Sequence, residues 1–190
     1  MAALSAVAAY GVMNLIMTST PLAMDRYGHD FERTAWVIQW HILGMYAPSF
    51  VTGHLIRRFS CTRVMIVGTF FLGMCVVVNL HGQSIPHFWS ALVLLGLGWN
   101  FLFIGGTTLV TEAYLPAEKA KTQGLNDFLV FGMVALTALT SGVLHQWLGW
   151  LTLNIVVVPM IVAALSAVIL LDRVRSRILA ISESGKIKSV

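Results

Sequence analysis

Residues 88–111 read FWSALVLLGLGWNFLFIGGTTLVT, a stretch of 24 residues without a charged side chain. The hydrocarbon core of a bilayer is about 30 Å thick, so about 20 helical residues suffice to cross it. Lipid offers no hydrogen-bonding partners, and a helix satisfies its backbone within a single segment. The stretch therefore predicts a transmembrane helix. Its four central glycines let neighbouring helices approach closely; they are Gly96, Gly98, Gly105 and Gly106.

Five further stretches match this one in length and character. They cover residues 2–24, 34–56, 64–82, 128–147 and 151–171. The chain of 190 residues is 57% hydrophobic and 11% charged, whereas soluble domains carry about 25% charged residues. That composition excludes a soluble globular enzyme, a disordered protein and a disulfide scaffold. We expect an all-α, polytopic membrane protein in which residues 1–171 form a bundle of six transmembrane helices and residues 172–190 form a basic cytoplasmic tail.

The basic residues predict how the chain lies in the membrane, because Lys and Arg collect in cytoplasmic loops. Only Arg26 and Arg33 fall on one side of the expected helices, so both termini are expected in the cytoplasm. The basic residues on the other side are Arg57, Arg58, Arg63, Lys119, Lys121, Arg173, Arg175, Arg177, Lys186 and Lys188. Their placement between apolar runs favours a membrane surface over nucleic acid as the partner.

The two cysteines, Cys61 and Cys75, lie in unlike settings with no metal-ligand spacing around them. They predict neither a disulfide framework nor a metal site, and nothing else in the sequence predicts a bound cofactor. The residues that contact a ligand are therefore expected among the polar and aromatic side chains.

Polar side chains are distributed unevenly over the apolar stretches. Stretches 64–82 and 151–171 hold few, so we expect these helices to face lipid. The other four hold groups that are costly in hydrocarbon, so they are expected to line an interior cavity. The candidates for contact with a solute are Asn14, Thr18, Gln39, His41, Trp99, Asn100 and Thr107. The alternative for a single Asn or Thr is a hydrogen bond between helices, worth about 0.6 kcal/mol on average.

His41 stands out because an ionisable residue in mid-membrane is a functional candidate by default. If transport is coupled to protons, we prefer His41 as the carrier over Asp127, which lies near the edge of its helix. The alternative is a neutral histidine that is hydrogen-bonded to a neighbouring helix.

The loop after the second stretch, residues 53–63, reads GHLIRRFSCTR. It resembles the G-x-L-x-D-R-x-G-R-R loop of the major facilitator superfamily, with Gly53, Leu55 and Arg58 at matching positions. Arg57 replaces the family's Asp, which argues against an Asp-based latch here. Together with the six expected helices and the polarity pattern, the loop makes the chain similar to the C-terminal half of a bacterial member.

That resemblance implies a secondary active transporter of a small organic solute, working by alternating access in the bacterial inner membrane. The family has twelve helices in two halves with the solute between them. The chain is therefore expected to be a fragment of such a protein, and a natural half-transporter that works as a dimer is the alternative. In either case its partners are the solute, the lipid bilayer and a second six-helix half.

The resemblance also implies a cytoplasmic gate built from charged residues at the helix ends. Its candidates are Gly53, Arg57, Arg58, Arg63, Glu112 and Asp127. We expect Glu112 and Asp127 to pair with Arg58 or Arg63 when this side is closed. The alternative is that these charges are simply solvated.

A different class of function is an intramembrane serine hydrolase. Ser141 and His145 are four residues apart, which places them on one face of a helix. However, no strained nucleophile turn and no oxyanion donors accompany them. A channel is a third class, but no filter-like loop is visible. Import and export of a solute fit the sequence equally well.

Overall fold

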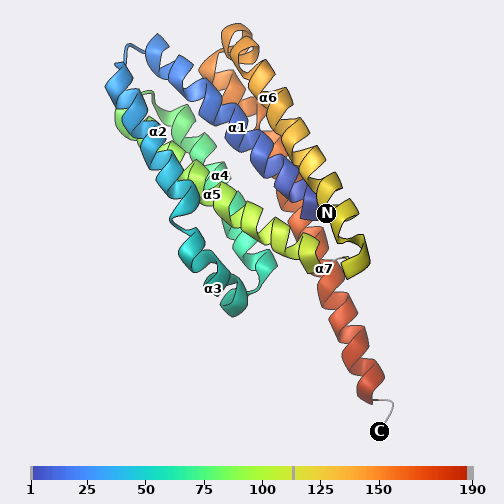
Figure 1. Ribbon diagram of the computed structural model, residues 1–190. Coiled ribbons are helices and arrows are strands. Elements are labelled where there is room, and N and C mark those ends of the chain that lie inside the picture. The colour runs from blue at the N-terminus through green and yellow to red at the C-terminus, as the bar shows by residue number, and fades with distance from the viewer. Residues whose placement is uncertain (1, 113, 188–190) are drawn as a thin grey trace.

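The computed structural model describes residues 2–112 and 114–187, with side chains for residues 3–112 and 114–177. All regular structure in these residues is helical (Figure 1). In chain order the helices are α1 (Ala2–Arg26), α2 (Phe31–Tyr46), α3 (Ser49–Phe59), α4 (Cys61–His81), α5 (Ile85–Glu112), the short 3-10 helix η1 (Pro116–Glu118), α6 (Lys119–Val156) and α7 (Val158–Ile187).

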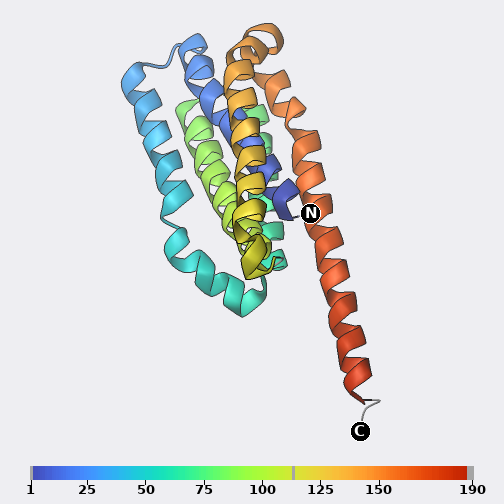
Figure 2. The same cartoon turned by 45° about the vertical axis from the view of Figure 1, so that its right-hand side comes forward.

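The bundle is built around α5, which packs most extensively against α4 and also against α2 and α1. α6 packs mainly on α1, and α7 lies against α1 and α4. Figure 2 shows α2 and α3 on one flank of the bundle and α7 on the other. The buried apolar core lies where α1, α4 and α5 meet, and it includes Ile16, Met65, Leu72 and Leu95.

Glycines on α5 remove side chains from its contacts with α2 and α4. A Cβ atom on Gly96 would lie 2.7 Å from the carbonyl oxygen of His41. One on Gly98 would lie 2.8 Å from the carbonyl oxygen of Gly68. Both distances are too short for ordinary contact, so any side chain would push the backbones apart. The close approach predicted for these glycines is confirmed.

The expected helix at 34–56 is divided into α2 and α3 at Ala47 and Pro48. A proline has no backbone N–H and its ring disturbs the preceding turn, so helices commonly kink there. The chain then reverses at Ser60, whose φ of 81° places it in the left-handed region just before α4 begins.

The last two expected helices, 128–147 and 151–171, also differ from the elements observed. α6 contains two helical segments, one before and one after Gly149. The φ of 73° at Gly149 interrupts the helix and turns the chain back along the bundle. α7 then continues as a helix to Ile187 and extends beyond the bundle (Figure 1). Part of the expected basic tail, 172–187, is therefore helical backbone, and residues 188–190 lie outside the described residues.

Four segments are long and apolar enough to cross a membrane: Ala3–Arg26, Cys61–His81, Ile85–Glu112 and Pro116–Arg177. The last is 62 residues long and reverses at Gly149. The prediction of an all-α, polytopic membrane protein is confirmed.

Buried asparagines of α4 and of the end of α6 are joined by a hydrogen bond, which leaves the Oδ1 of Asn79 without a partner among the described residues. The Nδ2 of Asn79 donates to the Oδ1 of Asn154 at 2.8 Å, and the Nδ2 of Asn154 donates to the carbonyl oxygen of Trp150 at 2.9 Å. The outward surface of α4 is apolar, with Val67 and Phe70 exposed. This arrangement suits a helix that meets hydrocarbon on its outer side.

Candidate functional site

Asn100 on α5 holds the break between α2 and α3. Its Nδ2 donates to the carbonyl oxygen of Met45 at 2.6 Å and to the Oγ of Ser49 at 2.7 Å, and its Oδ1 accepts from Thr52 at 2.7 Å. The side chain is 1% exposed. Asn100 therefore stabilises a kinked backbone whose ordinary helical hydrogen bonds are interrupted by Pro48.

His41 is fully buried between α2 and α5. Its Nδ1–H donates to the carbonyl oxygen of Leu92 at 2.8 Å, the hydrogen bond to a neighbouring helix that was one of its two sequence-based interpretations. Its Nε2 is buried without a hydrogen-bond partner among the described residues.

Asn14 joins α1 to α6. Its Nδ2 donates to the carbonyl oxygen of Val134 at 3.1 Å and to the Oγ1 of Thr137 at 2.9 Å. Thr18, one turn further along α1, donates to the carbonyl oxygen of Asn14 at 2.6 Å. Both side chains remain partly accessible, so they can offer polar atoms to a neighbouring molecule.

Trp99 belongs to a cluster of four aromatic rings from three helices. Its ring stacks on Phe103, with centroids 4.9 Å apart and an interplanar angle of 13°. Tyr10 from α1 meets Trp99 edge-on at 5.1 Å, and Tyr46 from α2 meets it edge-on at 6.2 Å. Trp99 is 4% exposed, whereas Tyr46 is 59% exposed. We call these four residues the aromatic cluster; Trp99 is its buried base and the tyrosines form its accessible edge.

The two further candidates, Thr107 and Gln39, lie on α5 and α2. Thr107 is one turn from Phe103 on α5 and donates to the Phe103 carbonyl oxygen at 2.8 Å. Gln39 is exposed on α2 and lines a cavity of about 410 Å³ between α1 and α2, together with Pro21 and Asp25. Asn14 lies one turn from Tyr10 on α1 and Thr107 lies one turn from Phe103 on α5, so each is next to a member of the aromatic cluster along its own helix, whereas Gln39 lies nearer the α1–α2 loop.

Five of the six gate candidates lie on α3, near the start of α4 or at the end of α5, whereas Asp127 lies about two turns into α6. Gly53, Arg57, Arg58, Arg63, Glu112 and Asp127 are all exposed. Glu112 is paired with Arg175 of α7, with the Oε2 and the guanidinium nitrogen 2.9 Å apart. Asp127 accepts a hydrogen bond from the adjacent Asn126 at 3.3 Å. Within the described side chains, neither acid pairs with Arg58 or Arg63.

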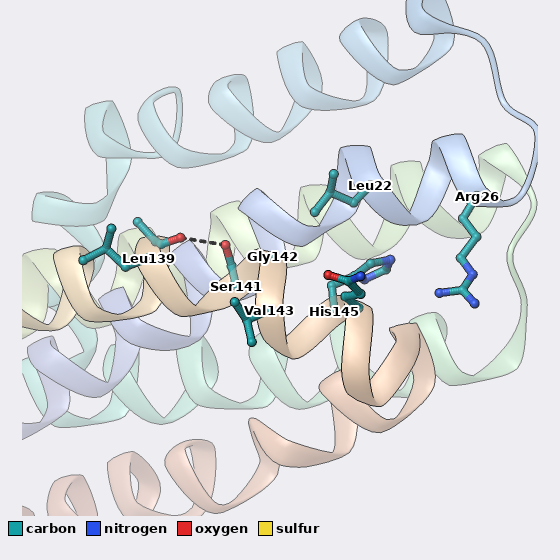
Figure 3. A pocket seen from close by; sticks show the side chains of 9 residues that line it. Leu22, Arg26, Leu139, Ser141, Gly142, Val143 and His145 are labelled. Carbon is teal, nitrogen blue, oxygen red and sulfur yellow. Dashed lines mark hydrogen bonds between the residues drawn. The ribbon is translucent and has the colours of Figure 1, made fainter.

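The pair Ser141 and His145 lines a cavity of about 660 Å³ beside Arg26 (Figure 3). The Ser141 hydroxyl donates to the carbonyl oxygen of Ala138 at 2.9 Å, along its own helix. Both ring nitrogens of His145 are buried without a partner among the described residues. The Ser141 hydroxyl donates to its own helix and makes no hydrogen bond with His145. The histidine is therefore not placed to act as the base that activates it.

Metal-ligating side chains do not gather anywhere in the described part of the chain: no group of three or more His, Cys, Asp or Glu residues lies within reach of one ion. Cys61 and Cys75 are buried free thiols, on α4. The Cys61 thiol donates to the carbonyl oxygen of Gly105 at 3.2 Å, so it serves the contact between α4 and α5.

Tyr10, Tyr46 and Phe103 were not predicted from the sequence as site residues, and Arg175 was expected only as one of the basic residues on the cytoplasmic side. A signal for two of them was present, because Tyr10 lies four residues before Asn14 and Phe103 lies four residues after Trp99. These spacings place each ring on the same helical face as a candidate. No such spacing connects Arg175 to Glu112, because their contact depends on how α7 packs.

Large apolar side chains are exposed on α3 and α6. Phe50 is 92% exposed, Trp147 is 83% exposed and Leu139 is 80% exposed. These surfaces lie on helices next to those of the aromatic cluster, since α6 packs on α1 and α3 follows α2. An apolar surface of this kind is stable only against lipid or against another protein surface.

Comparison with known proteins identifies the family. The chain is 43% identical over 164 residues to the riboflavin transporter RfnT of Brucella anthropi, a match covering 86% of this chain and 41% of RfnT. Two uncharacterized MFS-type transporters of Bacillus subtilis are also similar. The chain is 39% identical over 147 residues to YdeG, of which it covers 34%. It is 38% identical over 135 residues to YddS, of which it covers 30%. The chain thus spans less than half the length of these relatives, and no solved structure matches it significantly. The model of the Major Facilitator Superfamily matches residues 2–189, and this chain belongs to that family.

Proposed function

We propose that this chain forms one six-helix half of a secondary active transporter that moves a small organic solute by alternating access. The family is one of transporters rather than enzymes, so a hydrolase built on Ser141 and His145 is set aside. In this proposal α2 and α3 together make one crossing, and the chain turns back at Gly149 to make the sixth. Residues 1–171 are the bundle, and the second half belongs to the same polypeptide or to another copy.

The exposed apolar surfaces of α3 and α6 support a second half as the partner. α6 buries little of its outer side within the chain, and its exposed residues include Phe128, Phe131 and Leu139. Without a partner, the polar atoms of Asn14 and Thr18 beside these surfaces would face hydrocarbon, which is unfavourable. Docking of a second half would cover the apolar residues and leave the polar ones in a shared cavity.

The orientation proposed from the sequence fits the placement of charges. The α3–α4 turn, the α5–α6 connection and the C-terminal part of α7 lie at one end of the bundle, and they carry Arg57, Arg58, Arg63, Lys119, Lys121, Arg173, Arg175 and Arg177 (Figure 1). Arg26 and Arg33 lie at the opposite end. We therefore assign the basic end to the cytoplasm, with both termini there, in the cytoplasmic membrane of a bacterium.

The aromatic cluster is the observation that carries a proposal for the solute. Stacked and edge-on rings around Trp99 suit a flat aromatic molecule, and Asn14 and Thr107, each one turn along a helix from a ring of the cluster, supply neutral polar groups. The relative RfnT is named as a riboflavin transporter, and riboflavin has such a ring system. We infer that the solute is riboflavin or a molecule of the same planar, heteroaromatic class.

This inference is tested by riboflavin exchange in proteoliposomes that hold the full transporter containing this chain. Tyr46→Ala removes an exposed ring of the aromatic cluster, and we expect at least about a fivefold lower exchange rate, because ring stacking contributes about 1–3 kcal/mol. Tyr46→Phe keeps the ring and should retain exchange. Phe70→Ala, which removes an exposed ring from the outer side of α4, is the matched control. Saturable exchange of other solutes but not of riboflavin would exclude riboflavin as the solute, while the proposal that this protein is a transporter would stand.

Coupling to protons has its own test at His41, whose Nε2 has no partner in the described structure. His41→Gln retains a donor for the Leu92 carbonyl oxygen but cannot carry a proton. If the transporter is proton-coupled, we expect this variant to exchange solute but to lose solute-driven proton movement. His145→Gln is the control on α6. Unchanged proton movement in His41→Gln would exclude His41 as the carrier.

A further inference from the structure

The α3–α4 turn and α7 enclose a basic cavity at the cytoplasmic end of the bundle. Its volume is about 460 Å³, and Arg58, Arg63 and Arg175 line it. Arg175 is already paired with Glu112, and Thr62 donates to Asp172 on the same wall. In the part of the chain with described side chains, Arg58 and Arg63 have no carboxylate partner. Two guanidinium groups are therefore available to an anion.

An apolar groove continues from this cavity along the outer side of the bundle. The groove has a volume of about 340 Å³, and Leu55, Val67 and Phe101 line it. Phe59 and Arg63 line both the groove and the basic cavity, so the two form one continuous surface. Hydrocarbon is the environment that suits α4 here, because Val67 is 45% exposed and Phe70 is 62% exposed.

The combined chemistry selects one class of ligand. Arginine is suited to bidentate hydrogen bonds with phosphate, and basic pockets between transmembrane helices on the cytoplasmic side bind anionic headgroups. A soluble anion would use the basic cavity but would leave the apolar groove empty. We propose that an anionic phospholipid binds here, with its phosphate at Arg58 and Arg63 and one acyl chain in the groove beside Val67.

This site is separate from the one proposed for the solute. It is lined by α3, α4 and α7 together with Phe101 of α5, and it shares no residue with the aromatic cluster, which comes from α1, α2 and α5. Failure of lipid binding would therefore leave the transport proposal untouched. Conversely, a transporter that does not accept riboflavin would still be expected to bind the lipid.

Native mass spectrometry of the purified full chain in neutral detergent measures the lipid that stays bound. The probes are dioleoyl phosphatidylglycerol, dioleoyl phosphatidylcholine with the same acyl chains, and inorganic phosphate. We expect phosphatidylglycerol to be retained in preference to phosphatidylcholine. Arg58→Gln and Arg63→Gln should each weaken its binding about fivefold. Arg177→Gln removes an exposed basic residue of α7 outside the cavity and should change binding less than about twofold.

The groove is tested by filling it. Val67→Trp should displace the acyl chain and weaken phosphatidylglycerol binding, whereas Val77→Trp, at an exposed position of α4 outside the groove, should not. Size-exclusion chromatography and circular dichroism establish that each variant is folded, and the lipid comparison on the unaltered chain needs no variant. Equal retention of both lipids, or unchanged binding in both arginine variants, would overturn the proposal. Phosphate that binds as tightly as phosphatidylglycerol, with Val67→Trp unaffected, would also overturn it.

Discussion

α5 and α6 are both long, apolar helices, yet their surroundings are opposite. Thirteen of the 28 residues of α5 are buried, and most of these are apolar or glycine. Only eight of the 38 residues of α6 are buried, and five of these are polar: Asn126, Thr137, Ser141, His145 and Asn154. α5 is therefore a core helix with neighbours on several sides. α6 turns its buried polar groups toward its neighbours, Thr137 to Asn14 of α1 and Asn154 to Asn79 of α4, and leaves large apolar side chains exposed.

The comparison shows that hydropathy does not decide what a membrane helix faces. A helix that meets lipid or a partner with its outer side keeps its large apolar residues there and places polar residues inward. The smallest residues are decisive for α5, because Gly96 and Gly98 let backbones meet directly. On α6 the Cβ positions of Gly124, Gly132 and Gly142 have no neighbour within 4 Å. The same residue type thus marks a tight contact on one helix and an open side on the other.

A matched pair of glycine substitutions tests the difference in packing between α5 and α6 with the largest expected effect. Gly96→Ala places a methyl group 2.7 Å from the His41 carbonyl oxygen, so we expect it to lower the free energy of unfolding by about 2–3 kcal/mol. Gly132→Ala meets open space and should change it by less than about 0.5 kcal/mol. Unfolding in mixed detergent micelles, followed by circular dichroism, measures both. Equal losses would contradict the close packing of α5.

Two asparagines extend the comparison to hydrogen bonds. Asn100→Ala removes three hydrogen bonds around the α2–α3 break, and we expect a loss of about 2 kcal/mol in the free energy of unfolding. Asn14→Ala removes two hydrogen bonds to α6 and should cost about 1 kcal/mol. The same unfolding assay ranks them. A larger loss for Asn14 would mean that α6 contributes more to stability than its burial indicates.

The smallest expected effect belongs to the ion pair that joins the ends of α5 and α7. Glu112 and Arg175 are 52% and 43% exposed, so solvent and salt screen their attraction. Glu112→Gln should lower the free energy of unfolding by less than about 1 kcal/mol, and less in high salt. If the pair acts in the proposed gate, Glu112→Arg combined with Arg175→Glu should restore transport lost in either single variant. No rescue by this exchange would exclude the pair from the gate.

Much of the fold was predictable because the bilayer imposes a length on uncharged helical segments. The stretch 88–111 corresponds closely to α5, and 64–82 corresponds to most of α4. The kink at Pro48 was not predicted, since a proline in a membrane helix bends or breaks it according to its neighbours. Asn100 supplies the hydrogen bonds that stabilise this break, and its contact with Met45 depends on the register between two helices.

The candidate site was predictable only in part for the same reason. Residue type identified Asn14, His41 and Asn100 as costly in lipid, but their partners come from other helices. The residue type of Tyr10 and Tyr46 does not mark them as costly in lipid, because aromatic residues are common in apolar segments. Their role became visible when three helices brought them to one ring of Trp99.

Thiol labelling tests most directly whether the outer sides of these helices face different environments. In the full transporter with Cys61 and Cys75 replaced by alanine, single cysteines are placed at Gln39 and Tyr46 on α2, and at Val67 on α4 and Val162 on α7. All four positions are exposed on the isolated chain. A membrane-impermeant maleimide, supplied on both sides of the membrane, should label positions 39 and 46 and leave 67 and 162 unlabelled. Equal labelling of all four positions would contradict a water-filled cavity on the α2 side and lipid around α4 and α7.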